Sequence, residues 1–126
     1  MSKDFKTVLL VDDLEMLRKM LRDFLKSLGM EVLEASTAQE AIQIAHSHRG
    51  IIDLLLTDLQ MPEMSGWKVA KKISELEPDI YIIYMSGGIS PQEWRHHHER
   101  VAPSHFLQKP FGLRELKKLL LAILSE

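Results

Sequence analysis

Short apolar runs alternate along the chain with stretches in which apolar residues recur every three or four positions. The runs are typical of buried β-strands, and the spacing between them is typical of amphipathic helices. The predicted strands cover residues 7–11, 31–35, 51–57, 80–85 and 105–108. The predicted helices cover residues 14–28, 37–45, 69–76, a short polar segment that begins at 90, and 113–124. The pattern therefore predicts five strands that alternate with five helices.

Local signals mark the ends of several of these helices. Gly29 follows the first helix, where a glycine commonly ends a helix. Thr37 and Ser90 each precede a Glu by three residues, which is the pattern of a capping box at a helix start. Pro91 after Ser90 strengthens the second of these starts, because proline suits the first helical position.

Strands that alternate with helices require right-handed crossovers, which give a parallel sheet covered by helices on both faces. We therefore expect an α/β fold with a doubly wound five-stranded parallel sheet. The chain has 126 residues, less than the length of about 150 that serves as a one-domain prior. No linker or low-complexity stretch interrupts the pattern, so we expect a single domain over residues 1–126.

Composition excludes several classes of function. The net charge is −2, which removes the electrostatic argument for binding nucleic acid or an anionic membrane. There is no Cys, so thiol chemistry, Cys-ligated zinc and disulfides are excluded. Apolar runs such as 119–124 are far too short to span a bilayer. We expect a soluble cytoplasmic protein that contacts small ligands and other proteins.

Polar residues follow four of the predicted strands. The residues at these strand ends are Asp12 with Asp13, Asp58, Ser86 and Lys109. Taken singly, each has an ordinary explanation as a helix cap, a turn residue or a solvated side chain. However, the carboxyl ends of parallel strands share one edge of the sheet, which is where such folds bind ligands. We therefore expect these side chains to form one site.

The three carboxylates at this edge predict a cation. Crowded carboxylates repel one another and raise each other's pKa unless a positive charge is present. A hard divalent ion fits, and Mg²⁺ is typical where carboxylates and a phosphate share coordination. A carboxylate beside a metal can attack phosphorus, while Lys109 neutralises one phosphoryl oxygen and the Ser86 hydroxyl donates a hydrogen bond to another.

Four ordered blocks of the sequence resemble the receiver domain of response regulators in two-component systems. The blocks are residues 8–13, residues 53–66, Ser86 with Gly87, and residues 109–111. The resemblance runs nearly from end to end of the chain, which is similar to single-domain chemotaxis regulators. It implies a flavodoxin-like sheet in the order 2-1-3-4-5. It also implies a phospho-accepting signalling domain, not an enzyme with external substrates, which catalyses only its own phosphorylation and dephosphorylation.

The resemblance assigns roles to individual residues. Asp58 accepts a phosphoryl group from the phosphohistidine of a sensor histidine kinase or a phosphotransfer protein. Mg²⁺, with Mn²⁺ as the alternative ion, binds Asp12, Asp13, Asp58 and the backbone carbonyl of Gln60. Lys109 bridges to the phosphoryl group and enters a cis peptide bond with Pro110.

A switch is implied in the same way. Ser86 moves toward the phosphoryl group and Phe106 swings inward, so that the surface of the fourth helix, fifth strand and fifth helix changes for a downstream effector protein. Phe106 is otherwise a core residue. Trp94 is either an anchor for a partner on that surface or an ordinary packing residue.

Other functions fit the sequence less well. A nucleotide or flavin binder would need a phosphate-binding GxGxxG or P-loop pattern, which is absent. An Asp-based phosphatase commonly has a second Asp two residues on, where this chain has Gln60. Three consecutive residues of a helix, such as His96, His97 and His98, do not share a face, so we expect them to be solvated. A degenerate receiver that acts as a docking module, and a receiver fragment of a larger regulator or hybrid kinase, remain as alternatives.

Overall fold

The computed structural model describes residues 5–126, in which five parallel strands form one sheet. The order of elements along the chain is β1 (Thr7–Val11), α1 (Glu15–Ser27), β2 (Glu31–Ala35), α2 (Ala38–Ser47), β3 (Leu54–Asp58), α3 (Gly66–Leu76), β4 (Tyr81–Ser86), α4 (Pro91–His96), β5 (His105–Gln108) and α5 (Leu113–Leu124). The strands lie in the order β2-β1-β3-β4-β5. The predicted doubly wound fold and its strand order are confirmed.

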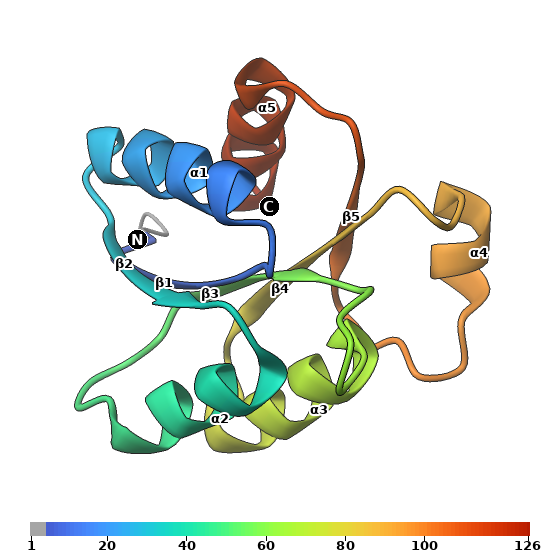
Figure 1. Cartoon of the computed structure of the whole chain (residues 1–126). Coiled ribbons are helices and arrows are strands. Elements are labelled where there is room, and N and C mark those ends of the chain that lie inside the picture. Colours follow the sequence, from blue (N-terminus) through green and yellow to red (C-terminus); the bar gives the residue numbers. More distant parts are fainter. Residues whose placement is uncertain (1–4) are drawn as a thin grey trace.

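The helices cover both faces of the sheet. Figure 1 shows α1 and α5 together on one face and α2 and α3 on the other. Each face has its own hydrophobic core, with the leucines of α1 and α5 in one and the alanines of α2 with the apolar residues of α3 in the other. The central strands are apolar on both sides for this reason, and all five residues of β3 are buried.

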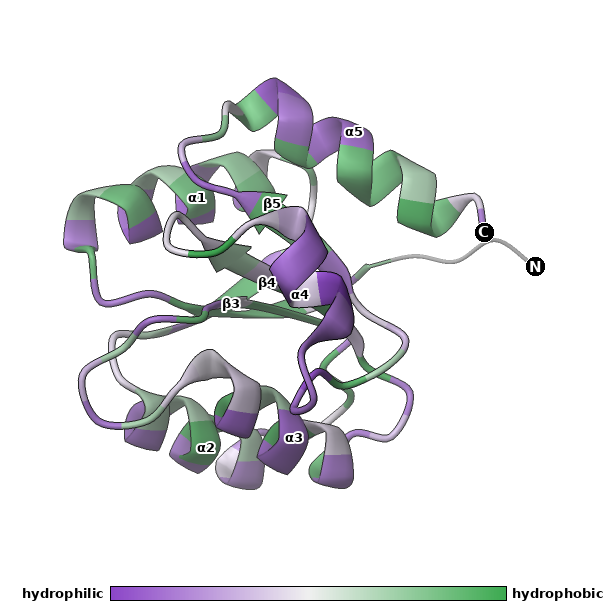
Figure 2. Ribbon diagram, turned by 90° about the vertical axis from the view of Figure 1, so that its right-hand side faces the viewer, coloured by the Kyte–Doolittle hydropathy of each residue, from purple (hydrophilic) through white to green (hydrophobic). Residues whose placement is uncertain are grey.

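The fourth helix differs from the others. Figure 1 shows it beside β5, at the edge of the sheet, and Figure 2 shows that it is largely hydrophilic. It has six residues, none of them buried, and it begins with the predicted capping box between Ser90 and Glu93. Of α4, only Trp94 packs against a core, from a half-buried position. This helix is therefore held by few contacts.

Some boundaries differ from the sequence prediction. The third strand begins at Leu54, whereas the apolar pattern placed its start at residue 51. Ile51 is 71% exposed, so its apolar side chain lies in the preceding loop and not in the sheet. Gly29 has the positive φ expected of a residue that follows a helix, at 93°. None of the helices within residues 5–126 has both the length and the apolar character needed to cross a bilayer.

Candidate functional site

The carboxyl ends of the strands bring the predicted site residues to one edge of the sheet. Asp12 follows β1, Asp58 and Ser86 are the last residues of β3 and β4, and Lys109 follows β5. The Lys109 backbone N–H donates to the Ser86 carbonyl at 2.8 Å, which continues the ladder between β4 and β5. The expected convergence of the strand ends therefore occurs.

Three carboxylates gather at this edge. Asp12, Asp13 and Asp58 each offer a carboxylate oxygen, and these oxygens lie within 4.8 Å of one another. Across residues 5–126 this is the one group of three or more acidic or histidine side chains with such a spacing. Asp12 and Asp58 are buried, whereas Asp13 is exposed. The set offers hard oxygen ligands on a partly open rim, which suits Mg²⁺.

The ammonium group of Lys109 lies against two of these carboxylates. Its Nζ is 3.0 Å from Asp12 Oδ2 and 3.4 Å from Asp58 Oδ2. The Lys109 side chain is 17% exposed, so the interaction is shielded from water. The lysine thus supplies positive charge to the acidic group. The Lys109–Pro110 peptide bond is cis, as the resemblance implies, and the Ala102–Pro103 bond is also cis.

Asp58 has a raised pKa. Burial of the carboxyl is the main cause, and the negative charge of Asp12 adds to it. The positive charge of Lys109 and the hydrogen bond from the Gln60 backbone N–H to Asp58 Oδ1, at 3.2 Å, act in the opposite direction. Crowding of the carboxylates alone does not account for this rise, because burial at the end of an internal strand contributes more.

The Gln60 side chain packs over the loop that follows β4. A Cβ added to Gly88 would lie 2.2 Å from Gln60 Nε2, so the amide occupies the space that a side chain at position 88 would fill. The side-chain amide of Gln60 thereby covers part of the loop beside the phosphoacceptor candidate. The role of the Gln60 backbone carbonyl as a metal ligand stays a prediction.

Ser86 and Phe106, the residues expected to switch, are both held in place. Ser86 is fully buried, and its Oγ accepts a hydrogen bond from the Gly88 N–H at 3.0 Å. Phe106 is half-buried and stacks on Trp94, with ring centroids 5.7 Å apart. Arg100 lies over the Trp94 ring at 4.9 Å. Trp94 is therefore a packing residue in this conformation, while part of its surface stays exposed.

The histidine cluster is arranged differently from the expectation. The helix ends at His96, so His97 and His98 are not helical and the argument from helix faces does not apply to them. The His97 ring stacks on Trp67 at 4.0 Å and nearly parallel, and His98 stacks on His97 at 4.8 Å. The prediction that all three are solvated is wrong for His97, which is half-buried.

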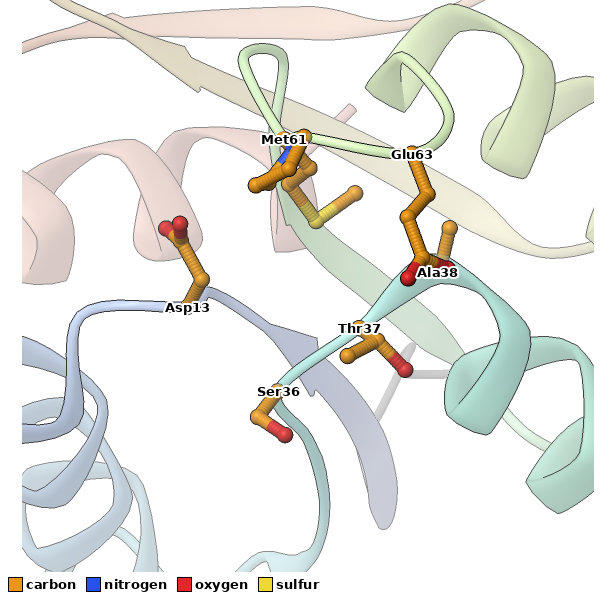
Figure 3. A pocket seen from close by; sticks show the side chains of 7 residues that line it. Asp13, Ser36, Thr37, Ala38, Met61 and Glu63 are labelled. Atoms are coloured by element: carbon orange, nitrogen blue, oxygen red, sulfur yellow. The ribbon is translucent and has the colours of Figure 1, made fainter.

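A small hollow lies beside Asp13, between the turn after β2 and the loop after β3. Figure 3 shows Asp13 on one side of it and Glu63 on the other, with Met61 between them. The remaining lining comes from Pro62 and from the turn that leads into α2, at Ser36, Thr37 and Ala38. The hollow leaves the exposed carboxylate of Asp13 reachable from this side.

Two contacts of the site were not predicted. Arg18 of α1 donates to the backbone carbonyl of Asp12, and it is paired with Glu34 of β2. Gly66 touches the backbone of Asp58 so closely that a side chain at that position would collide with it. Neither contact can be predicted from a local sequence pattern, because each joins segments that lie apart along the chain.

Comparison with known proteins identifies related chains. The chain is 36% identical over 87 residues to the autoinducer 1 sensor kinase/phosphatase LuxN of Vibrio campbellii, and 34% identical over 110 residues to the sensor kinase CckA of Brucella abortus. These matches cover 69% and 87% of this chain but only 10% and 12% of the relatives. The polar-differentiation response regulator DivK of Brucella anthropi is 37% identical over 70 residues, which is 56% of this chain and 55% of DivK. The chain thus spans only part of the length of these relatives.

Solved structures agree over nearly the whole chain. A response regulator receiver protein from Sinorhizobium medicae superposes with a TM-score of 0.82 at 30% identity, covering 97% of this chain and 96% of that one. The chemotaxis protein CheY4 of Vibrio cholerae gives a TM-score of 0.83 at 28% identity, with coverages of 96% and 100%. The family model described as the response regulator receiver domain matches residues 8–121. The chain therefore belongs to the receiver domain family of two-component response regulators.

Proposed function

We propose that the chain accepts a phosphoryl group on Asp58 in a Mg²⁺-dependent reaction, with the phosphohistidine of a sensor histidine kinase or phosphotransfer protein as the donor. One observation carries the proposal. Asp58 stands at the end of a buried strand, 3.4 Å from the Lys109 ammonium and within a group of three carboxylates. This arrangement unites a nucleophile, a positive charge for a phosphoryl oxygen, and ligands for a divalent cation.

The Asp58 carboxylate is the nucleophile in this reaction. One of its oxygens forms the new bond to phosphorus, while the bond from phosphorus to the donor imidazole nitrogen breaks and that nitrogen keeps the electron pair. The Gln60 N–H holds Asp58 Oδ1, so Oδ2 is the oxygen that faces Lys109. Because burial raises the pKa of Asp58, nearby positive charge is needed to keep it ionised and nucleophilic.

The residues around Asp58 fit a cation and a phosphoryl group. The carboxylates of Asp12, Asp13 and Asp58, with the Gln60 backbone carbonyl, would hold Mg²⁺ or Mn²⁺, and the ion would neutralise charge on the transferred phosphoryl oxygens. Lys109 has an ammonium group in reach of another phosphoryl oxygen. Ser86 would turn its hydroxyl from Gly88 to donate to a third.

A movement of Ser86 would then be transmitted to the surface of α4, β5 and α5. The Ser86 Oγ now accepts from Gly88, at the start of the segment that leads to α4. An inward swing of Phe106 would break its stack with Trp94 and loosen α4. A downstream effector protein would read this changed surface. On this proposal residues 1–126 form a single cytoplasmic receiver domain that has no direct contact with nucleic acid and catalyses only its own phosphorylation and dephosphorylation.

Intact-mass analysis after incubation with acetyl phosphate tests the proposal. We expect the wild-type chain to gain one phosphoryl group only when Mg²⁺ is present, and Asp58→Asn to gain none while remaining folded. Asp53→Asn is a matched control, because Asp53 lies just before the amino end of β3, whereas Asp58 lies at its carboxyl end. It should be labelled like the wild type.

Labelling of folded Asp58→Asn at the wild-type rate would overturn the assignment of the nucleophile. A wild-type chain that gains no mass, with acetyl phosphate or with a phosphorylated kinase sampled at short times, would overturn the phosphoacceptor proposal. That second outcome would instead favour a receiver that acts as a phosphorylation-independent docking module.

A further inference from the structure

The backbone of Asp12 is held by a charged group that lies outside the acidic site. Asp12 follows β1, and its N–H donates to the Ala35 carbonyl of β2 at 3.1 Å. Its own carbonyl accepts from Arg18 Nη1 at 2.9 Å. Asp12 is fully buried, so in this structure its carbonyl is hydrogen-bonded by Arg18 and not by solvent. The backbone N–H and the backbone carbonyl of Asp12 are therefore both held by hydrogen bonds.

Arg18 is itself held by an acidic residue of the edge strand. Its Nε lies 3.2 Å from Glu34 Oε1, and the Arg18 side chain is 15% exposed. The other oxygen, Glu34 Oε2, pairs with Arg22 Nη1 at 3.3 Å. A guanidinium group suits this geometry, because its rigid fork can donate to the carboxylate through Nε and to the carbonyl through Nη1 at the same time. A lysine ammonium has no such fork.

The direction of the Asp12 carboxylate depends on this backbone. One carboxylate oxygen, Oδ1, accepts from the Leu14 N–H at 2.9 Å, and the other, Oδ2, meets Lys109 Nζ at 3.0 Å. Because the Asp12 carbonyl belongs to the same peptide plane as the Asp13 N–H, a rotation of that plane would also move Asp13. Two of the three carboxylates therefore depend on the position of one carbonyl.

We propose that Arg18, clamped by Glu34, is a positioning residue that holds the Asp12 carbonyl and thereby preorganises the carboxylates of Asp12 and Asp13 for a divalent cation. The inference rests on the proposed function for its consequence, since it concerns the cation of that site. Groups that orient metal ligands from outside the coordination sphere commonly change metal affinity by about 10- to 100-fold when they are mutated. Figure 1 shows that α1, which carries Arg18, lies over one face of the sheet.

The test measures Mg²⁺ affinity by calorimetry in Arg18→Met, Glu34→Gln and Arg22→Met. We expect Arg18→Met to weaken Mg²⁺ binding by about tenfold. Glu34→Gln should weaken it less, because the amide oxygen still accepts from Arg18. Arg22→Met is the matched control: Arg22 pairs with the same carboxylate from one turn further along α1, and its hydrogen bonds go to Asp23 and Glu34. The Mg²⁺ affinity of Arg22→Met should stay within about twofold of the wild type, because loss of the Arg22 side chain leaves the hydrogen bond from Arg18 to the Asp12 carbonyl in place.

Hydrogen exchange of the metal-free protein gives a second readout that depends on neither metal nor phosphorylation. The Leu14 amide bonds to the Asp12 carboxylate, so its exchange should accelerate in Arg18→Met and stay at the wild-type rate in Arg22→Met. Equal acceleration in both variants would indicate a loss of stability in α1 and would overturn the positioning role. Wild-type exchange and wild-type affinity in Arg18→Met would overturn it as well. If the wild type bound no Mg²⁺, the metal-dependent function would fail, and with it the part of this inference that concerns the cation.

Discussion

Replacement of Gly66 by Ala tests how closely α3 must approach the phosphoacceptor candidate. Gly66 is the first residue of α3, and its N–H donates to the Leu59 carbonyl at 3.0 Å. Its backbone conformation does not require glycine, because its φ lies outside the positive region. Space is the constraint: a Cβ would lie 2.2 Å from the Asp58 carbonyl oxygen and 2.9 Å from the Leu59 Cα.

The size of the effect follows from these distances. Ordinary contact begins at 3.4 Å, so the shortest contact of 2.2 Å must open by about 1.2 Å, the difference between them. The colliding atoms are backbone and cannot rotate away, which places the cost at about 1–3 kcal/mol of unfolding free energy. A displacement of about 1 Å near a reacting group can cost about a hundredfold in rate. We therefore expect Gly66→Ala to be destabilised and to be phosphorylated about 10- to 100-fold more slowly.

Two measurements check this prediction. Urea unfolding gives the change in stability, and a time course of acetyl phosphate labelling by intact mass gives the change in rate. Gly112→Ala is the control, since a Cβ at position 112 meets nothing within 4 Å. That variant should lose no more than about 1 kcal/mol, the usual cost of Ala at the start of a helix. Gly66→Ala with wild-type stability and wild-type labelling would refute the steric argument.

Three further predictions concern other parts of the domain. Burial raises the pKa of Tyr84 to about 12, so as pH rises the unfolded chain loses the phenolic proton before the folded chain does. The free energy of unfolding therefore falls between about pH 10 and pH 12, by at most about 1.4 kcal/mol per pH unit. Tyr84→Phe should be the less stable protein at pH 8, because the Val101 N–H loses its acceptor, but its deficit in urea unfolding should shrink by pH 11; a constant deficit would contradict the raised pKa. Lys109→Ala should cost about 3 kcal/mol without divalent ions, because Asp12 and Asp58 lose their cation, and Mg²⁺ should raise its unfolding midpoint more than that of the wild type. An equal response of both proteins to Mg²⁺ would argue against competition between lysine and metal. Asp53→Ala should lose about 2 kcal/mol in urea unfolding, because Asp53 Oδ2 accepts from the backbone N–H groups of Lys6 and Thr7, and Asp53→Asn should lose less; equal losses in the two variants would count against that acceptor role.

The sequence predicted the features that depend on periodicity. Alternating strands and helices determined the doubly wound fold, and the carboxyl ends of parallel strands had to bring Asp12, Asp58 and Lys109 together. Boundaries were less predictable: the apolar Ile51 looked like part of β3, but it precedes the strand and is exposed. The end of α4 was also missed, because a polar helix has no apolar periodicity to show where it stops.

Contacts across the fold could not be predicted from the sequence. Arg18 and Glu34 are 16 positions apart, and nothing in the pattern of either segment indicates that they meet. The close approach of Gly66 to Asp58 depends on the path of the β3–α3 loop. The balance of causes behind the raised pKa of Asp58 likewise depends on how deeply β3 is buried, which a linear pattern does not specify.

Because α4 makes few contacts with the rest of the domain, a small free energy is enough to change its position. The α4 helix is held mainly by a capping box and by the stack of Trp94 on Phe106, whereas α1 and α5 each bury two leucines. A bias of about 1.4 kcal/mol changes the ratio of two conformers tenfold. A single rearranged hydrogen bond at Ser86 is of that size and could repopulate positions of α4, but it would leave the populations of α1 and α5 unchanged. Because none of its residues is buried, α4 is the helix whose position the smallest free energy would change.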